Sequence, residues 1–242
     1  EGIDDLEAAQ VEKYRSLAKL IRLSPGQKLL EIGSGWGSFA ILAAREFGAK
    51  VRSLTISKEQ HAFASKRVQE LGLGEQVSID LRDYRDVDGH YDRIASIEMF
   101  EAVGESWWPT FFGKVRDALV PGGVAGLQII TIADRYFADY RRSTDFIQRY
   151  IFPGGMLPSP SVLREQVERA GLSLRDQMAF GASYARTLGI WNESFDAAWD
   201  KVANLGFDTR FRRLWTYYLA YCEAGFRTGS TDVVQLAVAR QG

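Results

Sequence analysis

A glycine-rich turn between an apolar run and an amphipathic segment constrains the fold of this chain more than any other feature. The run Lys28–Ile32 is typical of a buried parallel strand, and Ser38–Phe47 has the apolar periodicity of a helix. Between them stand Gly33, Gly35 and Gly37. Glycine permits a positive φ and removes the Cβ atom that would hold a ligand away from the backbone. The pattern predicts a strand, loop and helix with a small molecule against the loop; the alternative is a glycine-rich turn without a ligand.

The spacing of the glycines and one acidic residue indicate which ligand the loop takes. Dinucleotide-binding loops have the spacing G-x-G-x-x-G. Here the third glycine comes one position earlier, and Glu31 stands two residues before Gly33. A carboxylate at the strand end repels a pyrophosphate and attracts an ammonium or sulfonium group. We therefore predict that the loop binds S-adenosylmethionine.

Strand-like and helix-like segments alternate through the first half of the chain. This alternation is typical of a mostly parallel sheet with helices on both faces, so it predicts an α/β, Rossmann-like fold. With 242 residues, the chain is expected to form a single domain over residues 1–242. The further predicted helices are 6–23 and 58–71, the latter capped by Ser57, and the further predicted strands are 50–56, 77–81, 91–97 and 124–132.

The topology predicts where a ligand binds. In parallel sheets of this kind, ligands lie beyond the carboxyl ends of the strands. We therefore expect the glycine loop to meet three other segments at one edge of the sheet: Thr55–Gln60, Asp83–Tyr84 and Glu98–Glu101.

The composition excludes several classes of function. A formal net charge of −1 gives no field for steering nucleic acid, so we expect no nucleic-acid binding. The only cysteine is Cys222, which excludes an internal disulfide and a cysteine-built zinc site, and no other spacing predicts a metal site. No apolar run approaches the roughly 20 residues that span a bilayer, and no signal-peptide pattern opens the chain. We therefore expect a cytoplasmic protein.

Two stretches depart from the plain sheet pattern. Residues 133–160 are rich in Tyr, Phe and Arg and are interrupted by Pro153-Gly154-Gly155, which predicts an active-site insertion or lid. Residues 191–227 are predicted to form two helices with many aromatic side chains. These are Trp191, Phe195, Trp199, Phe207, Phe211, Trp215, Tyr217, Tyr218, Tyr221 and Phe226. They either wall a cavity for a long apolar substrate or pack as a helical layer on the sheet, and the residues alone favour the second interpretation.

Six stretches carry motifs of one known family. They are EIGSGWG at 31–37, LTISKEQ at 54–60, DYRD at 83–86, YDRIASIEMFE at 91–101, YIFPGG and LPS at 150–159, and TYYLAYC and GFR at 216–227. Over almost its whole length the chain resembles the cyclopropane-fatty-acyl-phospholipid synthases and the mycolic acid cyclopropane synthases, which are S-adenosylmethionine-dependent methyltransferases. The resemblance implies a class I methyltransferase fold with a helical insertion that binds an acyl chain.

The resemblance also implies which residues hold the cofactor. The glycine loop holds the methionine part, Thr55 and Gln60 reach the ribose hydroxyls, and Asp83 and Tyr84 lie where the adenine is expected. Independently, a hydroxyl and an amide suit a diol, and a tyrosine face suits a purine. The expected cofactor-binding residues are Glu31, Gly33, Ser34, Gly35, Trp36, Gly37, Thr55, Ile56, Gln60, Asp83 and Tyr84.

The resemblance implies methyl transfer to a cis double bond of an acyl chain, which leaves a carbocation. A base then removes a proton. Loss from the new methyl group closes a cyclopropane ring, whereas a hydride shift and loss from a neighbouring carbon give a methyl-branched or methylene product. The position of the base therefore decides the product.

The base site of this chain departs from the family pattern. The family is thought to use a bicarbonate held by an upstream cysteine, a glutamate, a histidine, a backbone group and a tyrosine. The glutamate matches Glu101, but Ile130 and Asn192 stand at the histidine and tyrosine positions. A buried anion short of donors costs several kcal/mol, so bicarbonate is doubtful as a cofactor. An apolar pocket would raise the pKa of Glu101 toward the range of a base; alternatively, Glu101 binds backbone amides for structural reasons.

Cys222 matches a cysteine that has been treated as an active-site residue in the family. Methyl transfer to an alkene needs no thiol nucleophile, and no histidine stands next to Cys222. The resemblance thus implies Glu101 and Cys222 as the catalytic residues, whereas the surroundings of Cys222 in the sequence favour a packed wall residue.

The leading hypothesis is a methyltransferase that modifies an unsaturated acyl chain of a membrane phospholipid, with a methyl-branched or methylene product favoured over a cyclopropane. Two alternatives stay open: a methyltransferase for a small polar or amine acceptor, and a non-catalytic partner subunit with the same fold. Four arginines are spread along the aromatic insertion, so we expect a peripheral contact with the inner membrane surface. They are Arg135, Arg141, Arg142 and Arg149. A homodimer is left open.

Overall fold

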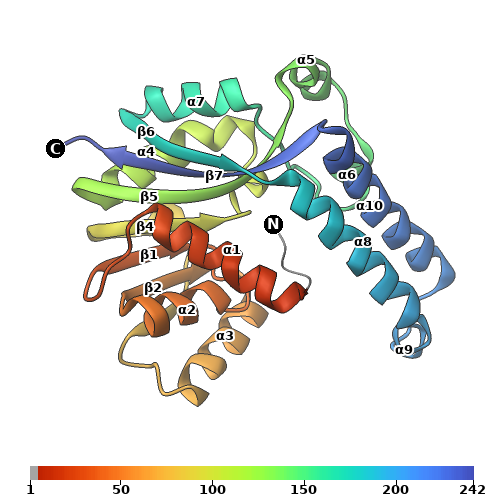
Figure 1. Ribbon diagram of the computed structural model, residues 1–242, viewed down its shortest axis with the longest axis horizontal. Coiled ribbons are helices and arrows are strands. Elements are labelled where there is room, and N and C mark those ends of the chain that lie inside the picture. Colours follow the sequence, from red (N-terminus) through yellow and green to blue (C-terminus); the bar gives the residue numbers. More distant parts are fainter. Residues whose placement is uncertain (1–4) are drawn as a thin grey trace.

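The computed structural model describes residues 5–242, and a seven-stranded sheet forms its core (Figure 1). The strand order is β3-β2-β1-β4-β5-β7-β6. The strands are β1 (Lys28–Ile32), β2 (Lys50–Thr55), β3 (Val77–Leu81), β4 (Tyr91–Ile97), β5 (Leu119–Ile132), β6 (Leu172–Ala179) and β7 (Thr231–Arg240). The pairs among β1 to β5 are parallel, and β7 is antiparallel to both β5 and β6. The predicted mostly parallel α/β sheet is confirmed.

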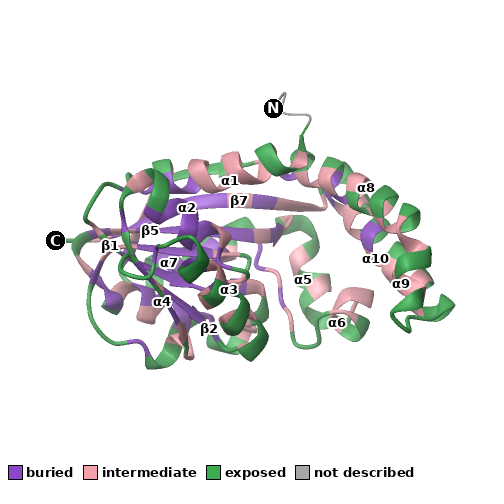
Figure 2. Cartoon of the chain, turned by 90° about the horizontal axis from the view of Figure 1, so that it is seen from below, coloured by how far each residue is buried: buried purple, intermediate pink, exposed green. Residues whose placement is uncertain are grey.

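Helices cover both faces of this sheet. On one face lie α1 (Leu6–Leu20), α2 (Ser38–Phe47) and α3 (Lys58–Glu70), and on the other lie α4 (Trp108–Ala118) and α7 (Pro160–Arg169). Alternate residues of β1 point to opposite faces, so Leu29 packs in the first layer while Leu30 packs in the second. Figure 2 shows the sheet buried between the two layers.

Several boundaries differ from the sequence prediction. The first helix ends at Leu20 rather than at residue 23, because Arg22 adopts a left-handed φ of 52° that ends the helical path. Strand β5 begins at Leu119, before Pro121-Gly122-Gly123, instead of after it. The helix cap at Ser57 is confirmed, since its Oγ accepts a hydrogen bond from the amide of Gln60 at 3.2 Å.

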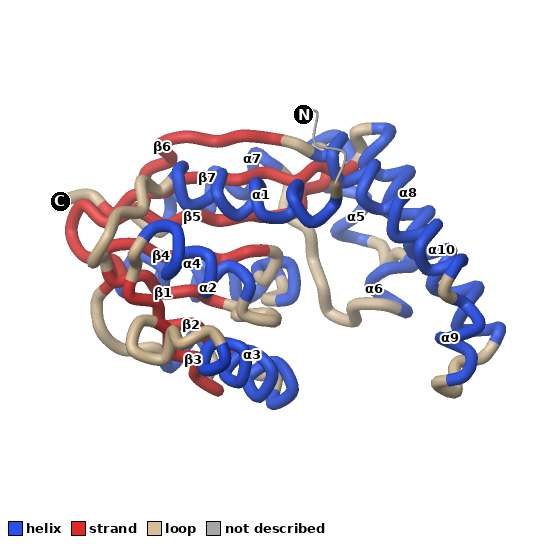
Figure 3. The backbone as a smooth tube through the Cα atoms, turned by 60° about the horizontal axis from the view of Figure 1, so that its bottom comes forward, coloured by secondary structure: helices blue, strands red, loops and turns tan. Residues whose placement is uncertain are grey.

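The aromatic helices stand at the carboxyl-terminal end of the parallel strands (Figures 1 and 3). They are α8 (Gly181–Ala197), the short α9 (Trp199–Asn204) and α10 (Thr209–Thr228). The first begins ten residues before the predicted stretch 191–227. Helices α8 and α10 pack on each other through Ala185, Leu188, Leu219 and Phe226. Helices α5 (Asp134–Arg142) and α6 (Phe146–Tyr150) of the predicted insertion lie beside them.

Candidate active site

The glycine loop adopts the backbone conformation that its sequence predicts. Gly33, Gly35 and Gly37 have positive φ values of 94°, 49° and 83°. A Cβ atom on Gly33 would lie 3.1 Å from the Cβ of Met99, so a larger residue would need its neighbour to move. The amides of Gly33 and Ser34 donate to the carbonyl of Leu54 at 3.0 and 2.7 Å. The loop is thereby fixed to β2 at the carboxyl edge of the sheet.

Glu31 lies under this loop as a buried acid. Its Oε2 accepts a hydrogen bond from the Ser53 hydroxyl at 2.5 Å. Burial raises the pKa of Glu31 to about 8, and the Ser53 hydrogen bond opposes this effect. Neutral solution therefore favours the protonated form in the ligand-free protein. The predicted attraction for a cationic ligand group requires the ionised form, which the arrival of a cation would favour.

The raised pKa of Glu31 predicts how stability depends on pH. The folded-state value of about 8 exceeds the ordinary 4.5, so the folded protein holds a proton that the unfolded chain releases between these pH values. This contribution to stability is present at low pH and is lost as pH rises through about 8. Glu31→Gln removes the titration, so the variant should lose less stability than the wild type between pH 5 and 8, by ~2–4 kcal/mol.

Chemical denaturation of the ligand-free protein at a series of pH values measures this difference. Glu70→Gln is the matched control, because Glu70 is exposed and pairs with Lys66 on α3. Equal pH slopes for the wild type and Glu31→Gln would contradict the prediction.

The predicted ribose-binding pair forms at the end of β2. The Thr55 hydroxyl donates to Gln60 Oε1 at 2.8 Å and accepts from the Ser57 amide at 3.1 Å. Between them in sequence, Ile56 is 78% exposed at the edge of the sheet. Trp36 is 53% exposed, and its ring meets that of Phe63 edge to face.

After β3, Asp83 caps a short 3-10 turn, η1 (Tyr84–Asp86), and Tyr84 is the first residue of this turn. The Asp83 carboxylate accepts from the Arg85 amide at 2.9 Å and from its guanidinium at 2.7 Å, which lowers the pKa of Asp83. The Tyr84 ring packs edge to face against Phe111. Because β1, β2 and β3 are neighbours in the sheet, the structure brings the glycine loop, Thr55 and Asp83 to one edge, as predicted.

Glu101 lies at the next strand end, in η2 (Phe100–Ala102) after β4. Its Oε1 accepts a hydrogen bond from the backbone amide of Ile130 at 2.5 Å. Its Oε2 is buried and has no hydrogen-bond partner among the described residues. Burial is the main cause that raises the pKa of Glu101 to about 8. Ile130 thus supplies an amide, and no polar side chain, beside this carboxyl.

A polar network that the sequence analysis did not assign lies beside Glu101. Glu98 Oε1 accepts from Gln128 Nε2 at 2.6 Å and from the Tyr184 hydroxyl. Gln128 Oε1 accepts from Gln235 Nε2 at 2.9 Å, and Lys13 Nζ donates to the Tyr184 hydroxyl at 3.3 Å. The sequence offers one signal for it: Gln128 and Gln235 each interrupt a run of apolar residues.

Cys222 does not have the environment of a nucleophile. It packs within α10 against the cluster of Ala185, Leu188 and Leu219. Burial raises the pKa of its thiol to about 12, so the thiolate is scarce at neutral pH. This environment favours the interpretation of Cys222 as a wall residue of the α8–α10 pair.

Two structural features are absent from residues 5–242. No group of three or more His, Cys, Asp and Glu side chains in that range could hold a metal ion. No helix in the same range is long and apolar enough to cross a membrane.

Solved structures share this fold over nearly the whole chain. The cyclopropane synthase MmaA2 from Mycobacterium tuberculosis matches with a TM-score of 0.91 and 29% identity, over 99% of this chain and 87% of that one. The mycolic acid cyclopropane synthase CmaA1, solved with SAH and CTAB, matches with a TM-score of 0.91 and 28% identity, over 98% of this chain and 86% of that one. The chain therefore has the class I methyltransferase fold.

Curated relatives and a family model agree with these structures. Tuberculostearic acid methyltransferase UfaA1 of Mycobacterium tuberculosis is 44% identical over 98% of this chain, and the cyclopropane-fatty-acyl-phospholipid synthase of Escherichia coli K12 is 36% identical over 98%. The chain spans 56% and 59% of the length of these two relatives. The family model for mycolic acid cyclopropane synthetase matches residues 2–236. The resemblance noted in the sequence is confirmed, and the chain belongs to the mycolic acid cyclopropane synthetase family.

Proposed function

We propose that this chain transfers a methyl group from S-adenosylmethionine to the cis double bond of an unsaturated acyl chain. The family membership and the glycine loop support the cofactor, because the loop exposes backbone where a side chain would block a ligand. The aromatic α8–α10 pair at the same edge of the sheet supports an apolar acceptor, since its rings offer a surface for a long hydrocarbon chain.

One observation carries the proposal: the buried Oε2 of Glu101 has no partner among the described residues. An unpaired buried carboxyl oxygen costs free energy in the folded state, so it persists at a site where a group must arrive or a proton must move. Methyl transfer to an alkene creates such a need, because the cationic product must lose a proton.

The proposed reaction involves the cofactor, the acyl double bond, Glu101 and the α8–α10 pair. When bound, S-adenosylmethionine would supply an electrophilic methyl group. The electron pair of the double bond would form the new carbon–carbon bond while the sulfur–methyl bond breaks, and its electrons would stay on the sulfur of the departing S-adenosylhomocysteine. The substrate is left as a carbocation. Glu101, when ionised, accepts a proton from a carbon next to the cationic centre, and the electrons of that C–H bond form a double bond. The α8–α10 pair excludes water that would otherwise add to the cation.

We propose a methyl-branched or methylene product rather than a cyclopropane. Support comes from the base site: Ile130 offers Glu101 only a backbone amide, where the family pattern has a histidine, so a bicarbonate would find few donors. The relative UfaA1 is named a tuberculostearic acid methyltransferase, which agrees with this proposal.

The test incubates the protein with S-adenosylmethionine labelled in its methyl group and with phosphatidylglycerol vesicles that carry a cis-monounsaturated chain. We expect label in the acyl chain and vinylic protons in the NMR spectrum of the product. Cyclopropane ring protons would overturn the proposed product. Label transfer to water-soluble amines, with none to lipid, would overturn the proposed acceptor.

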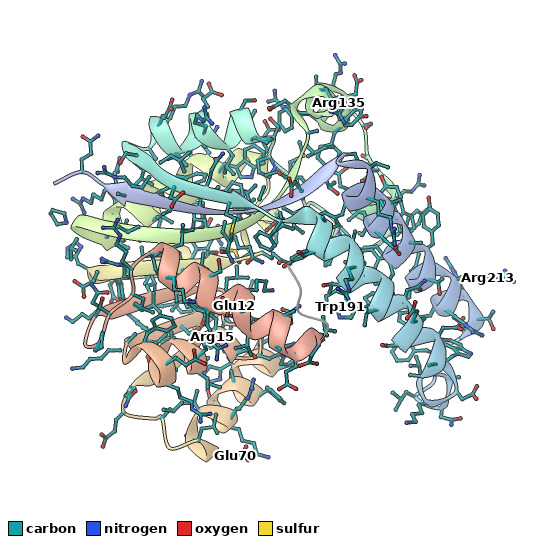
Figure 4. The ribbon with its side chains drawn as sticks, in the orientation of Figure 1. Glu12, Arg15, Glu70, Arg135, Trp191 and Arg213 are labelled. Carbon is teal, nitrogen blue, oxygen red and sulfur yellow. The ribbon has the colours of Figure 1, made fainter. Side chains whose placement is uncertain are left out.

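We further propose that the substrate is reached on an anionic phospholipid surface. Exposed aromatic residues gather on the insertion and on α10. The rings of Phe146 on α6 and Tyr217 on α10 meet edge to face, with 4.6 Å between their centroids. The exposed rings are Tyr136, Tyr150, Phe152, Tyr217 and Tyr221. Arg135 points outward from α5 (Figure 4). Aromatic rings beside cations suit the interface of a lipid bilayer.

The choice of variants for this surface follows from the ion pairs. Arg141 pairs with Glu105 and Arg142 with Asp139, so neither is the best probe of lipid binding. Arg135 and Arg149 lie over the rings of Tyr136 and Tyr150. The double variant Arg135→Glu/Arg149→Glu should sediment at least ~5-fold less with anionic vesicles, since each basic residue contributes ~1 kcal/mol near the surface. Arg45→Glu on α2 is the control, and equal sedimentation of both variants would contradict the proposal.

A further inference from the structure

Glu98 combines a strained backbone with a fixed side chain at the end of β4. It follows β4 directly, is exposed, and has a φ of 52°, a left-handed conformation that side chains with a Cβ rarely adopt. Such residues persist where the surroundings hold them, and they gather at functional sites. Here the backbone amide of Glu98 donates to the carbonyl of Gln128 at 2.9 Å, so β5 holds the strained residue in place.

The side chain of Glu98 is held through one oxygen by two neutral donors. The Gln128 amide and the Tyr184 hydroxyl both donate to Oε1, and an ionised carboxylate is the form that only accepts. The donors are themselves fixed, since Gln128 bonds to Gln235 on β7 and Tyr184 bonds to Lys13 on α1. Residues of four elements, β5, β7, α1 and α8, therefore fix the position of the Glu98 carboxylate.

Glu98 and Glu101 are anchored to the same strand. The side chain of Gln128 holds the first, and the amide of Ile130 holds the second. These anchors are two residues apart on β5, which is about 7 Å along a strand. The two carboxyl groups are thus close enough for the charge of one to bias the proton affinity of the other.

We propose that Glu98 is a positioning residue whose fixed negative charge strengthens Glu101 as a proton acceptor. The inference rests on the proposed function, because it assigns Glu101 the proton of the methylated substrate. Burial raises the pKa of Glu101, and the charge of Glu98 adds to this effect. The groups that act on this pair come from three helices. They are Lys13 and Tyr14 of α1, Tyr184 of α8 and Tyr218 of α10.

The first experiment follows the pH dependence of kcat/KM, which reports the ionisation of the free enzyme, for the wild type and for Glu98→Gln. The wild-type rate should rise with pH through a midpoint near 8, where Glu101 ionises. In Glu98→Gln the midpoint should move about 0.5–1 pH unit lower, because the repelling charge is gone. Affinity for S-adenosylhomocysteine, measured by calorimetry, should stay within about threefold.

Two results would overturn the inference. An unchanged midpoint would mean that Glu98 does not act on Glu101. A loss of more than about tenfold in S-adenosylhomocysteine affinity with an unchanged midpoint would make Glu98 a cofactor ligand instead. Tyr184→Phe should move the midpoint in the same direction by a smaller amount, since it frees the Glu98 side chain.

A second variant separates charge from folding. Glu98→Gly removes the carboxylate and suits a φ of 52°, so it should melt at or above the wild-type temperature, whereas Glu98→Ala should melt lower than Glu98→Gly. Both should show the lowered midpoint. Glu70→Gln is the charge control, because Glu70 lies at the end of α3, away from α8 (Figure 4).

A measurement of the Glu101 titration that needs no turnover tests the role of Glu98 separately from the proposed function. The side-chain carboxyl carbon of Glu101 can be titrated by NMR in protein labelled at glutamate, with Glu101→Gln to assign the signal. A lower titration midpoint in Glu98→Gln supports the inference even when no acyl substrate turns over. Failure of the enzyme on every acyl lipid, with that shift present, overturns only the proposed function.

Discussion

Glu101→Gln is expected to lower the rate of product formation from an unsaturated acyl substrate by about 10²–10⁴-fold, the usual contribution of a positioned general base. Glutamine keeps the size of the side chain, and its carbonyl still accepts from the Ile130 amide, so the fold should be retained. The variant lacks the group that takes the proton. Single-turnover assays with labelled S-adenosylmethionine measure the loss.

The same variant has a defined control. Glu101 lies in η2, and its buried Oε2 has no partner in the described structure, so S-adenosylhomocysteine should bind Glu101→Gln with nearly wild-type affinity. The variant should also be more stable than the wild type above pH 8, because it removes a buried acid whose pKa is about 8. Wild-type turnover in Glu101→Gln would remove Glu101 from the mechanism and leave the base unassigned.

The positions of the strands along the chain could be predicted well from the sequence because they depend on local signals. The strands Lys28–Ile32, Val77–Leu81 and Tyr91–Ile97 match the prediction. The first is mainly apolar, and in Val77–Leu81 apolar residues alternate with polar ones. The predicted pair of helices over 191–227 begins ten residues after the start of α8 (Gly181–Ala197), because closely spaced aromatic residues begin only at Trp191. The first half of α8 mixes small residues with Tyr184, Arg186 and Leu188, and Ala185 and Leu188 pack with α10.

Site residues could be predicted from the sequence only where the backbone conformation requires one particular residue type. Gly33 and Gly37 could be assigned because glycine, which lacks a Cβ atom, is the residue that adopts a positive φ most readily. Glu98 could not be assigned, because the residues around it in the sequence do not predict a left-handed φ for a glutamate. Its hydrogen-bond partners Gln128 and Tyr184 are also 30 and 86 residues away in the chain. Contacts between such distant residues depend on the packing of β5 and α8 at the end of the sheet.

Gly33→Val is expected to abolish tight binding of S-adenosylhomocysteine, with a loss of at least ~30-fold in affinity. A φ of 94° is adverse for a β-branched residue, and its Cβ would stand 3.1 Å from the Cβ of Met99. The loop would therefore shift or the chain would bear strain, at a cost of ~2–4 kcal/mol of stability. Isothermal calorimetry and thermal melts measure the two effects.

The graded series at this position separates strain from loss of ligand contact. Gly33→Ala should fall between the wild type and Gly33→Val in both stability and affinity, because alanine adds only the Cβ. Gly74→Ala is the matched control, since a Cβ there meets no atom within 4 Å. If Gly33→Val destabilises the fold but binds S-adenosylhomocysteine like the wild type, the ligand does not lie against this loop, and the cofactor site must be sought elsewhere along the carboxyl edge of the sheet.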